Sequence, residues 1–325
     1  MKPAFLLSFL TISLFYGCRK EEFAGIPVIS TTAVTEISGV SMASGGSITS
    51  DGGATVTSRG IYWSTNPDQT TDVNKTFDGA GTGNFTSNMS GLNGSTTYFV
   101  RAYATNSTGT AFGNQLSFTT RISDIDGNDY HSITVGTQTW MVENLRVTHL
   151  NDGSDIQLIT SDLEWETSKS PGYCWYYNIV PVGGYNGALY NFYTINTGKL
   201  CPDGWRVPSD GEWKTLEMYL GMSQSQADMI NWRGEGTSTL LKAIDGWYVL
   251  NGIQDMYGFK ALPAGSRHGL TGGFEDYNRG AYWWSSTIYD DTNAWVRGIV
   301  SGETTIYRGN LINKSGFSVR CLKNN

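Results

Sequence analysis

The chain has 325 residues, among them 40 Gly, with 13% aromatic and only 16% charged residues and a formal net charge of −7. A negatively charged chain without clusters of Lys and Arg lacks the surface that binds nucleic acid or anionic lipid by charge, so neither is an expected partner. Its three His residues argue against a dedicated histidine metal site. The length indicates two domains, and the composition favours β-rich folds with many tight turns.

The N-terminus resembles the export signal of a bacterial lipoprotein. Residues 5–16 form a mostly apolar run that ends at Gly17-Cys18. The run is shorter than the roughly 20 residues that cross a hydrocarbon core, so it predicts a secretory signal that is removed before folding. The small residue before Cys18 fits lipoprotein cleavage, whereas Phe15 and Tyr16 depart from the Leu and small residue usually found there.

This resemblance implies a signal peptide at residues 1–17, a lipid on Cys18 and a tether over residues 18–26. Residues 20–22, Lys-Glu-Glu, are similar to the signal that sends some lipoproteins of the Bacteroides type to the outer face of the outer membrane. We therefore expect a chain that is anchored to the outer membrane through the Cys18 lipid and faces the cell exterior. The alternative is a signal that is not cleaved, or is cleaved elsewhere.

Residues 27–120 carry the pattern of a β-sandwich. Short β-branched runs are separated by Gly, Asn, Ser and Asp turns, and residues 98–104 alternate with a period of two, as in a strand with one buried face. Residues 92–106, which include Thr-Tyr-Phe-Val-Arg-Ala-Tyr-Ala-Thr-Asn, resemble the sixth strand of a fibronectin type III domain. The resemblance implies a fibronectin type III-like sandwich in which the Tyr98 hydroxyl reaches back to the preceding turn. Such sandwiches are commonly spacers.

A different pattern begins near residue 122. Residues 124–129, Asp-Ile-Asp-Gly-Asn-Asp, offer several oxygens of the kind that Ca²⁺ binds. However, a standard calcium-binding loop has Gly at its sixth position and Glu at its twelfth, whereas here Gly is the fourth residue and no Glu follows at the twelfth position. A turn that leads into a hairpin is therefore favoured, and no cofactor or metal is expected. The hairpin is predicted over residues 130–145, with Val-Gly-Thr at its turn.

One longer helix is predicted after residue 209. Ser209 or Asp210 can cap it, with Glu212 in its positive first turn. Apolar side chains follow at helical spacing, and Gly221 is a C-terminal stop (Trp213, Leu216 and Leu220 share one face). Shorter helices are expected over residues 225–230 and 238–244, with short strands and long loops elsewhere.

The segments from residue 122 onwards resemble the Fibrobacter succinogenes major paralogous domain, a family of secreted and surface proteins. The resemblance rests on the opening Asp-Ile-Asp-Gly-Asn-Asp-Tyr and on ordered landmarks at residues 172–176, 187–193, 201–213, 258–265, 283–287 and 316–321. It implies a domain over residues 122–325 with a variant of the C-type-lectin-like fold, which formylglycine-generating enzymes share. The predicted fold class is thus mostly β, with a fibronectin type III-like sandwich followed by an α+β lectin-like domain.

Three cysteines remain after Cys18, namely Cys174, Cys201 and Cys321. An exported protein can keep disulfides, but an odd number allows at most one bridge here, and spacing does not select it. Lectin-like domains bridge their two ends, so the resemblance implies a disulfide between Cys201 and Cys321; the alternative is two free thiols. Cys174 is predicted to be a buried free thiol rather than a nucleophile.

No sequence motif indicates catalysis. The chain has no Gly-x-Ser-x-Gly elbow, no His-Glu-x-x-His and no phosphate loop. Formylglycine-generating enzymes use a pair of active-site cysteines, which the structural Cys201 and Cys321 would not supply. The acidic and amide triplets of calcium-dependent lectins are also absent, so sugar binding of that kind is not expected.

The loop over residues 264–282 is the predicted ligand-binding segment. It mixes aromatic rings, which cover the C–H surface of a sugar, with amide and charged groups, which pair with hydroxyls. For Tyr277 and Arg279 packing on the domain is an equal alternative, whereas for the adjacent Trp283 and Trp284 packing is favoured. The candidate ligand-binding residues are Arg267, His268, Asp276, Tyr277, Asn278, Arg279 and Tyr282.

Together these features predict a non-enzymatic, surface-exposed lipoprotein that binds a glycan or a protein partner. Two alternatives remain open. One is a structural subunit of a cell-surface complex, which a single large apolar patch would favour. The other is an enzyme on a lectin-like scaffold, which a deep pocket with two suitably spaced carboxylates would favour.

Overall fold

The computed structural model describes residues 24–67, 74–180, 185–250 and 252–324. The predicted signal peptide and Cys18 lie outside the described residues. The chain forms two compact units, one of residues up to Ala33, 44–87 and 99–116, and one of residues 34–43, 88–98 and 117–325. None of the helices in the described ranges is both long enough and apolar enough to cross a membrane.

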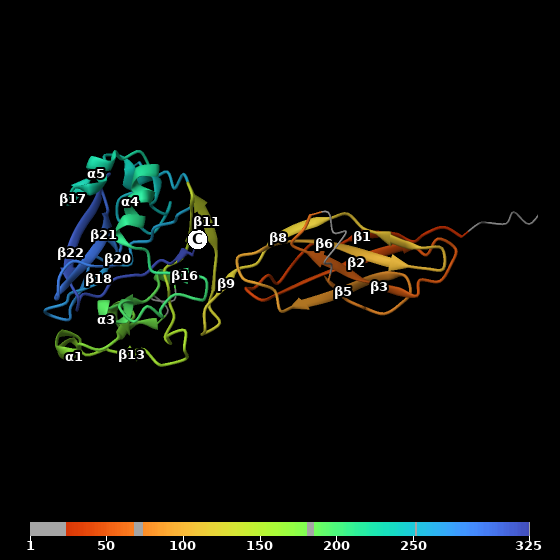
Figure 1. The fold of residues 1–325 in the computed structure, drawn as a ribbon, viewed down its shortest axis with the longest axis horizontal. Helices are drawn as coiled ribbons and strands as arrows, with labels where there is room; N and C mark the ends of the chain where they lie inside the picture. The colour runs from red at the N-terminus through yellow and green to blue at the C-terminus, as the bar shows by residue number, and fades with distance from the viewer. Residues whose placement is uncertain (1–23, 68–73, 181–184, 251, 325) are drawn as a thin grey trace, which may run out of the picture. The chain divides into compact units, whose positions relative to one another are not determined.

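Among the described residues from 28 to 119, eight strands form two sheets (Figure 1). The first sheet has the order β1-β2-β5, and the second has the order β4-β3-β6-β7 with β8 paired to β6. The strands are β1 (Val28–Thr31), β2 (Ser41–Ser50), β3 (Ser58–Ser64), β4 (Asn74–Lys75), β5 (Gly83–Ser90), β6 (Thr97–Thr105), β7 (Thr110–Phe112) and β8 (Leu116–Thr119).

The two sheets of the sandwich pack closely where β2 passes β6. A Cβ atom at Gly46 in β2 would lie 2.8 Å from the Cβ of Ala102 in β6, so only glycine fits there. Tyr98, Val100, Ala102 and Ala104 are buried along β6, as the predicted alternation requires, but Tyr103 on the opposite face is buried as well, so the alternation holds only up to Ala102. The predicted tyrosine corner is also confirmed, because the Asn93 N–H donates to the Tyr98 hydroxyl over 2.9 Å.

The C-terminal domain contains two four-stranded sheets, ordered β11-β12-β23-β16 and β17-β22-β21-β20 (Figure 1). The first sheet unites the beginning and the end of the domain, because β12 and β16 both pair with β23. Their strands are β11 (Ser132–Val135), β12 (Gln138–Met141), β16 (Trp205–Arg206), β17 (Asn231–Arg233), β20 (Gly280–Ile288), β21 (Asn293–Val300), β22 (Ile306–Ile312) and β23 (Leu322–Lys323). The predicted hairpin is β11-β12, with Gly136 at φ 63° in its turn.

Shorter strand pairs and helices complete the domain. The short strands are β9 (Ile122–Ser123), β10 (Asp129–Tyr130), β13 (Gln157–Leu158), β14 (Gly172–Cys174), β15 (Leu189–Tyr190), β18 (Ser266–Arg267) and β19 (Phe274–Glu275). The helices are α1 (Asp162–Thr167), α3 (Phe192–Ile195), α4 (Asp210–Tyr219) and α5 (Gln224–Asp228), with 3₁₀ turns η1 (Tyr176–Asn178) and η2 (Thr237–Leu240). In Figure 1, α4 and α5 lie at one end of the domain and α1 and α3 at the other.

Helix α4 forms as its sequence predicts. Ser209 and Glu212 make a reciprocal capping box at its start, and Trp213 and Leu216 are buried on one face. Gly221 follows at φ 110°, a conformation that favours glycine. The helix predicted over residues 238–244 is wrong beyond Leu240, because the backbone leaves the 3₁₀ turn to pair with residue 261.

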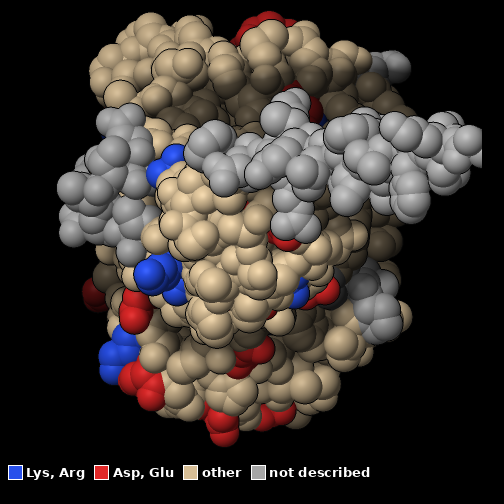
Figure 2. Space-filling model, turned by 90° about the vertical axis from the view of Figure 1, so that its right-hand side faces the viewer, with Lys and Arg blue, Asp and Glu red and all other residues tan. Residues whose placement is uncertain are grey.

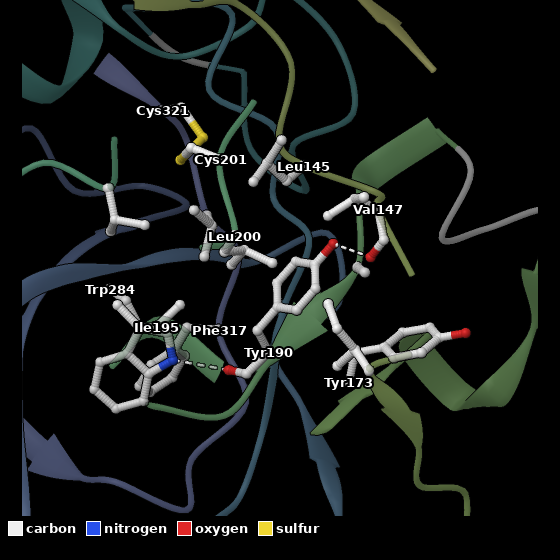
Figure 3. Close-up of a cluster of buried hydrophobic side chains, with 14 of the residues drawn as sticks. Leu145, Val147, Tyr173, Tyr190, Ile195, Leu200, Cys201, Trp284, Phe317 and Cys321 are labelled. Atoms are coloured by element: carbon white, nitrogen blue, oxygen red, sulfur yellow. Dashed lines mark hydrogen bonds between the residues drawn. A yellow bond between two sulfur atoms is a disulfide. The ribbon is translucent and has the colours of Figure 1, made fainter. Parts of the chain in front are cut away.

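Trp283 and Trp284 are both buried, on opposite faces of β20. Trp283 packs among Trp213 and Phe259, whereas Trp284 packs against Phe192 and Phe317 in the second core. In Figure 3 the Trp284 indole N–H donates to the Tyr190 carbonyl over 2.8 Å, and the Tyr190 hydroxyl donates to the Val147 carbonyl over 2.7 Å. Two adjacent residues of one strand therefore join two hydrophobic clusters.

A disulfide joins Cys201 to Cys321, as the resemblance implied. Both residues are buried in the cluster of Figure 3. Cys174 is a free, fully buried cysteine, as predicted. Burial raises the pKa of its thiol to about 12, so it is not poised to act as a nucleophile.

A buried network of charges fastens α4 to the sheet β17-β22-β21-β20. Glu217 accepts hydrogen bonds from Arg233 and Arg297, each over 2.6 Å. Asp210 accepts from Arg297 over 2.9 Å and from Arg308 over 2.8 Å. All five residues are buried. Burial raises the pKa of Asp210, but the hydrogen bonds and charges of Arg308 and Arg297 outweigh it, and the net pKa is lowered.

Candidate functional site

Four aromatic side chains from two separate segments form a cluster that we call the aromatic platform: Tyr176, Tyr177, Phe274 and Tyr277. Tyr176 and Tyr277 stack with ring centroids 4.9 Å apart and 25° between the ring planes. The Tyr177 ring lies 4.7 Å from Tyr176 and 5.4 Å from Phe274. Tyr176 is buried, whereas Tyr177 is 60% and Tyr277 is 37% exposed. The platform therefore exposes aromatic surface to solvent, and this surface packs on the buried Tyr176 ring.

The backbone beneath the platform is strained. Tyr177 and Asn178 have φ of 51° and 58°, and Asp276 and Asn278 have φ of 62° and 59°. Asn and Asp adopt this left-handed region readily, whereas for a residue such as Tyr it costs about 1–3 kcal/mol, and such residues cluster at functional sites. The strained position of the platform is therefore Tyr177.

Polar groups flank the platform on the turn after β19. Asp276, Asn278 and Arg279 are exposed. Asp276 accepts a hydrogen bond from the Tyr282 hydroxyl over 2.8 Å. The Arg279 guanidinium lies 4.7 Å from the centre of the Tyr248 ring. Among the predicted ligand residues, the structure thus brings Asp276, Tyr277, Asn278 and Arg279 together on one exposed turn.

The prediction that Arg267 contacts a ligand is wrong, because its side chain is fully buried. Its guanidinium lies between the rings of Trp165 and Phe274, at 4.5 and 4.8 Å from their centres. It also donates to the carbonyls of Gly272 and Ile159 over 2.7 and 2.5 Å. Arg267 therefore holds the platform from beneath.

His268 and Tyr282 have local bonding partners. The His268 ring nitrogen Nδ1 accepts the Leu270 N–H over 3.3 Å, within the turn that joins β18 to β19. Tyr282 is half-buried, with its hydroxyl on Asp276. Burial, then the hydrogen bond and charge of Asp276, raise the pKa of Tyr282 well above its ordinary value.

Tyr176 and Tyr177 lie outside the predicted ligand-binding loop, and Phe274 lies within it but is not among the candidate ligand-binding residues. The run Tyr-Cys-Trp-Tyr-Tyr at residues 173–177 is rich in aromatics, but alternation along a strand cannot show that residues about 100 positions apart stack on one another. Tyr177 stands out only in the structure, through its exposure and its positive φ.

The acidic segment at residues 124–129 forms a turn, as favoured. Asp124 Oδ1 accepts the backbone N–H groups of Asp126 and Asn128 over 3.0 and 2.9 Å, and Asp124 Oδ2 accepts the Tyr130 hydroxyl over 2.6 Å. Throughout the part of the chain that the structure describes, no three His, Cys, Asp or Glu side chains are grouped to hold a metal ion.

Replacing Asp126 by Asn should lower the pKa of His149. His149 Nδ1 lies 2.5 Å from Asp126 Oδ1, and Nε2 lies 3.0 Å from Asp155 Oδ1. The hydrogen bond to Asp126, opposed by partial desolvation and aided by both carboxylate charges, raises the pKa of His149 above 6.5. The protonated ring therefore stabilises the fold below pH 6.5, and this contribution is lost as the pH rises through the raised pKa.

The measurement is an NMR titration of the His149 ring. Asp152→Asn in the neighbouring turn is the control, because Asp152 pairs with Lys199. An unchanged His149 pKa in the Asp126→Asn variant would contradict this account.

Figure 2 shows a few separate Lys and Arg side chains and somewhat more Asp and Glu among mostly uncharged residues, without a large patch of Lys and Arg among the described atoms of this face. The described chain is thus β-rich and has two parts, and this view shows no basic face.

The sequence model of the Fibrobacter succinogenes major domain matches residues 133–323. The chain belongs to this family.

Comparisons with other proteins add likenesses of fold. No curated protein matches the chain. It is similar to the sensor domain of the anti-sigma factor RsgI4 of Pseudobacteroides cellulosolvens, with 13% identity over 30% of this chain and 95% of that chain and a TM-score of 0.24. It is also similar to the fourth fibronectin type III domain of a human protein, with 18% identity over 34% of this chain and 88% of that chain and a TM-score of 0.24.

Proposed function

We propose that this chain is a surface-exposed lipoprotein whose C-terminal domain binds a glycan without catalysing a reaction. The observation that carries the proposal is the exposure of the Tyr177 and Tyr277 rings, which both pack on the buried Tyr176 ring, Tyr277 by stacking and Tyr177 edge-on. Aromatic rings offer apolar faces of fixed orientation, on which the C–H surface of a sugar ring can lie.

The polar neighbours of the platform suit hydroxyl groups. Asp276 accepts only one side-chain hydrogen bond among the described residues, from Tyr282, so its carboxylate retains acceptor capacity. Asn278 exposes an amide, which both donates and accepts. A sugar bound on the rings would place its hydroxyls beside these groups.

We also propose that the domain is a variant of the C-type-lectin-like fold. Support comes from the disulfide between Cys201 and Cys321 and from the sheet β11-β12-β23-β16, which unites the two ends of the domain. The Cys18 lipid would hold the domain at the outer membrane, facing the cell exterior.

A glycan array probed with the purified chain, with and without Ca²⁺, tests the proposal. Tyr277→Ala and Tyr177→Ala should each weaken binding about tenfold, because each removes a stacking face. Tyr219→Ala is the matched control, since Tyr219 is 53% exposed on α4 and contacts Tyr257 rather than the platform. Binding that survives both platform substitutions, or no binding in either condition, would overturn the proposal.

A protein partner is the second candidate. Ile179 and Val180 follow Tyr177 in the chain and are 49% and 58% exposed. Exposed apolar side chains next to an aromatic cluster also suit a protein interface. Capture of one specific surface protein, lost on Ile179→Asp, together with a negative array would favour this reading.

A further inference from the structure

A hollow of about 460 Å³ lies on the C-terminal domain and shares no residue with the aromatic platform. It is bounded by the segment after β12, by Tyr185, by the segment after η2 and by the loop at residues 255–262. Its apolar lining comes from Val142, Ala243, Ile244 and Leu262. A volume of this size is typical of sites for small organic ligands.

Charges of both signs line the hollow without pairing with one another. They are Glu143, Asp245 and Asp255 against Arg146 and Lys260. Within the described ranges, neither Arg146 nor Lys260 has a carboxylate within ion-pair distance, and Asp245 and Asp255 have no cation within it. Charged side chains that form no ion pair with one another can pair with the charged groups of a ligand.

Some of these groups are fixed by other contacts. Glu143 Oε1 lies 2.7 Å from His131 Nδ1. Arg146 Nε donates to Asn128 Oδ1 over 3.0 Å, and its Nη2 donates to the Asp129 carbonyl over 3.2 Å. These bonds orient the guanidinium and leave its Nη1 without a hydrogen bond to any described residue.

The loop that carries Asp255 and Lys260 is strained. Both residues have positive φ, at 40° and 50°. The Lys260 N–H donates to the Asp255 Oδ1 atom over 3.0 Å, and a backbone hydrogen bond from Phe259 also acts on this carboxylate and lowers its pKa. Burial is the main influence on Asp255 and raises its pKa, so its carboxylate is incompletely compensated by the protein.

A buried cation lies next to this loop. Arg320 is fully buried, and its guanidinium donates to the carbonyls of Phe259 and Lys260 rather than to a carboxylate. The negative charges of Glu143 and Asp255 favour the charged form of Arg320. Three carboxylates and two cations line the hollow itself, and the buried Arg320 next to the loop adds a third positive charge, so the region is neutral in sum but its charges are separated.

We infer that this hollow binds a zwitterionic ligand of about dipeptide size. Its ammonium group would pair with Asp245 and Asp255, its carboxylate would pair with Arg146 and Lys260, and its aliphatic carbons would lie on Val142, Ala243 and Leu262. A ligand with a net charge of either sign would leave an uncompensated charge in a partly desolvated site, which is costly.

Isothermal titration calorimetry on the full chain tests the inference with lysyl-glutamate as the probe. We expect saturable binding of this zwitterion and much weaker binding of dilysine and diglutamate. Asp255→Asn and Lys260→Gln should each weaken binding about tenfold, because each loses one charged hydrogen bond to the ligand.

The controls separate this site from the platform and from general charge effects. Asp291→Asn and Lys169→Gln change exposed charges that do not line the hollow and should bind as the unmodified chain does. Tyr277→Ala should also bind normally, whatever its effect on a glycan. Absence of lysyl-glutamate binding, equal binding of dilysine or diglutamate, or normal binding by both hollow variants would overturn the inference.

Discussion

Replacing Cys201 and Cys321 together by Ala should lower the free energy of unfolding by about 4–5 kcal/mol. The bridge joins residues separated by 120 positions, and cross-linking a loop of that length removes a large conformational entropy from the unfolded chain. Equilibrium denaturation in urea measures the change. Reduction of the unmodified chain should reproduce most of it, since the same constraint is released.

Cys174→Ala is the matched control for the disulfide. It also removes a fully buried sulfur but opens no loop, so its cost should be smaller and should not depend on reductant. A loss below about 1 kcal/mol in the double variant would show that the bridge stabilises the fold far less than its loop length implies.

Glu217→Ala should destabilise the fold by about 3–5 kcal/mol, the cost of removing one partner from a buried ion pair. Glu217 is 1% exposed and is the carboxylate that accepts from both Arg233 and Arg297. Without it, two buried guanidinium groups lose their shared counter-charge. Thermal and urea unfolding would both measure the loss.

Two further variants sharpen this prediction. Glu217→Gln keeps the side-chain shape and one hydrogen-bond acceptor, so a large loss there would assign the effect to charge. Glu164→Ala, in the exposed first turn of α1, should cost far less. Similar losses for Glu217→Ala and Glu164→Ala would contradict the role given to the buried network.

Features set by neighbouring residues could be predicted from the sequence. The helix start at Ser209, with Glu212 in its first turn, and the Gly136 turn each depend on contacts a few residues apart. The tyrosine corner at Tyr98 and the disulfide followed from the family resemblances rather than from spacing. The adjacent Trp283 and Trp284 had to point to opposite faces of a strand, whatever the strand packed against.

Features that depend on distant contacts could not be predicted. Arg267 has the residue type of a ligand contact, but two rings and several carbonyls from elsewhere in the chain bury it. The segment after Leu240 left the helix pattern because it pairs with residue 261. The platform and the hollow each combine segments that are far apart in sequence, so no local pattern marks either of them.

The sheet β11-β12-β23-β16 has a consequence for how this domain can be used. Its first and last segments, β11-β12 and β23, run side by side in one sheet. A domain whose ends meet can be inserted into a surface loop of another protein without spreading the loop, or rejoined end to end and opened elsewhere. Gene fusion could therefore move the C-terminal domain from one protein to another as a single unit.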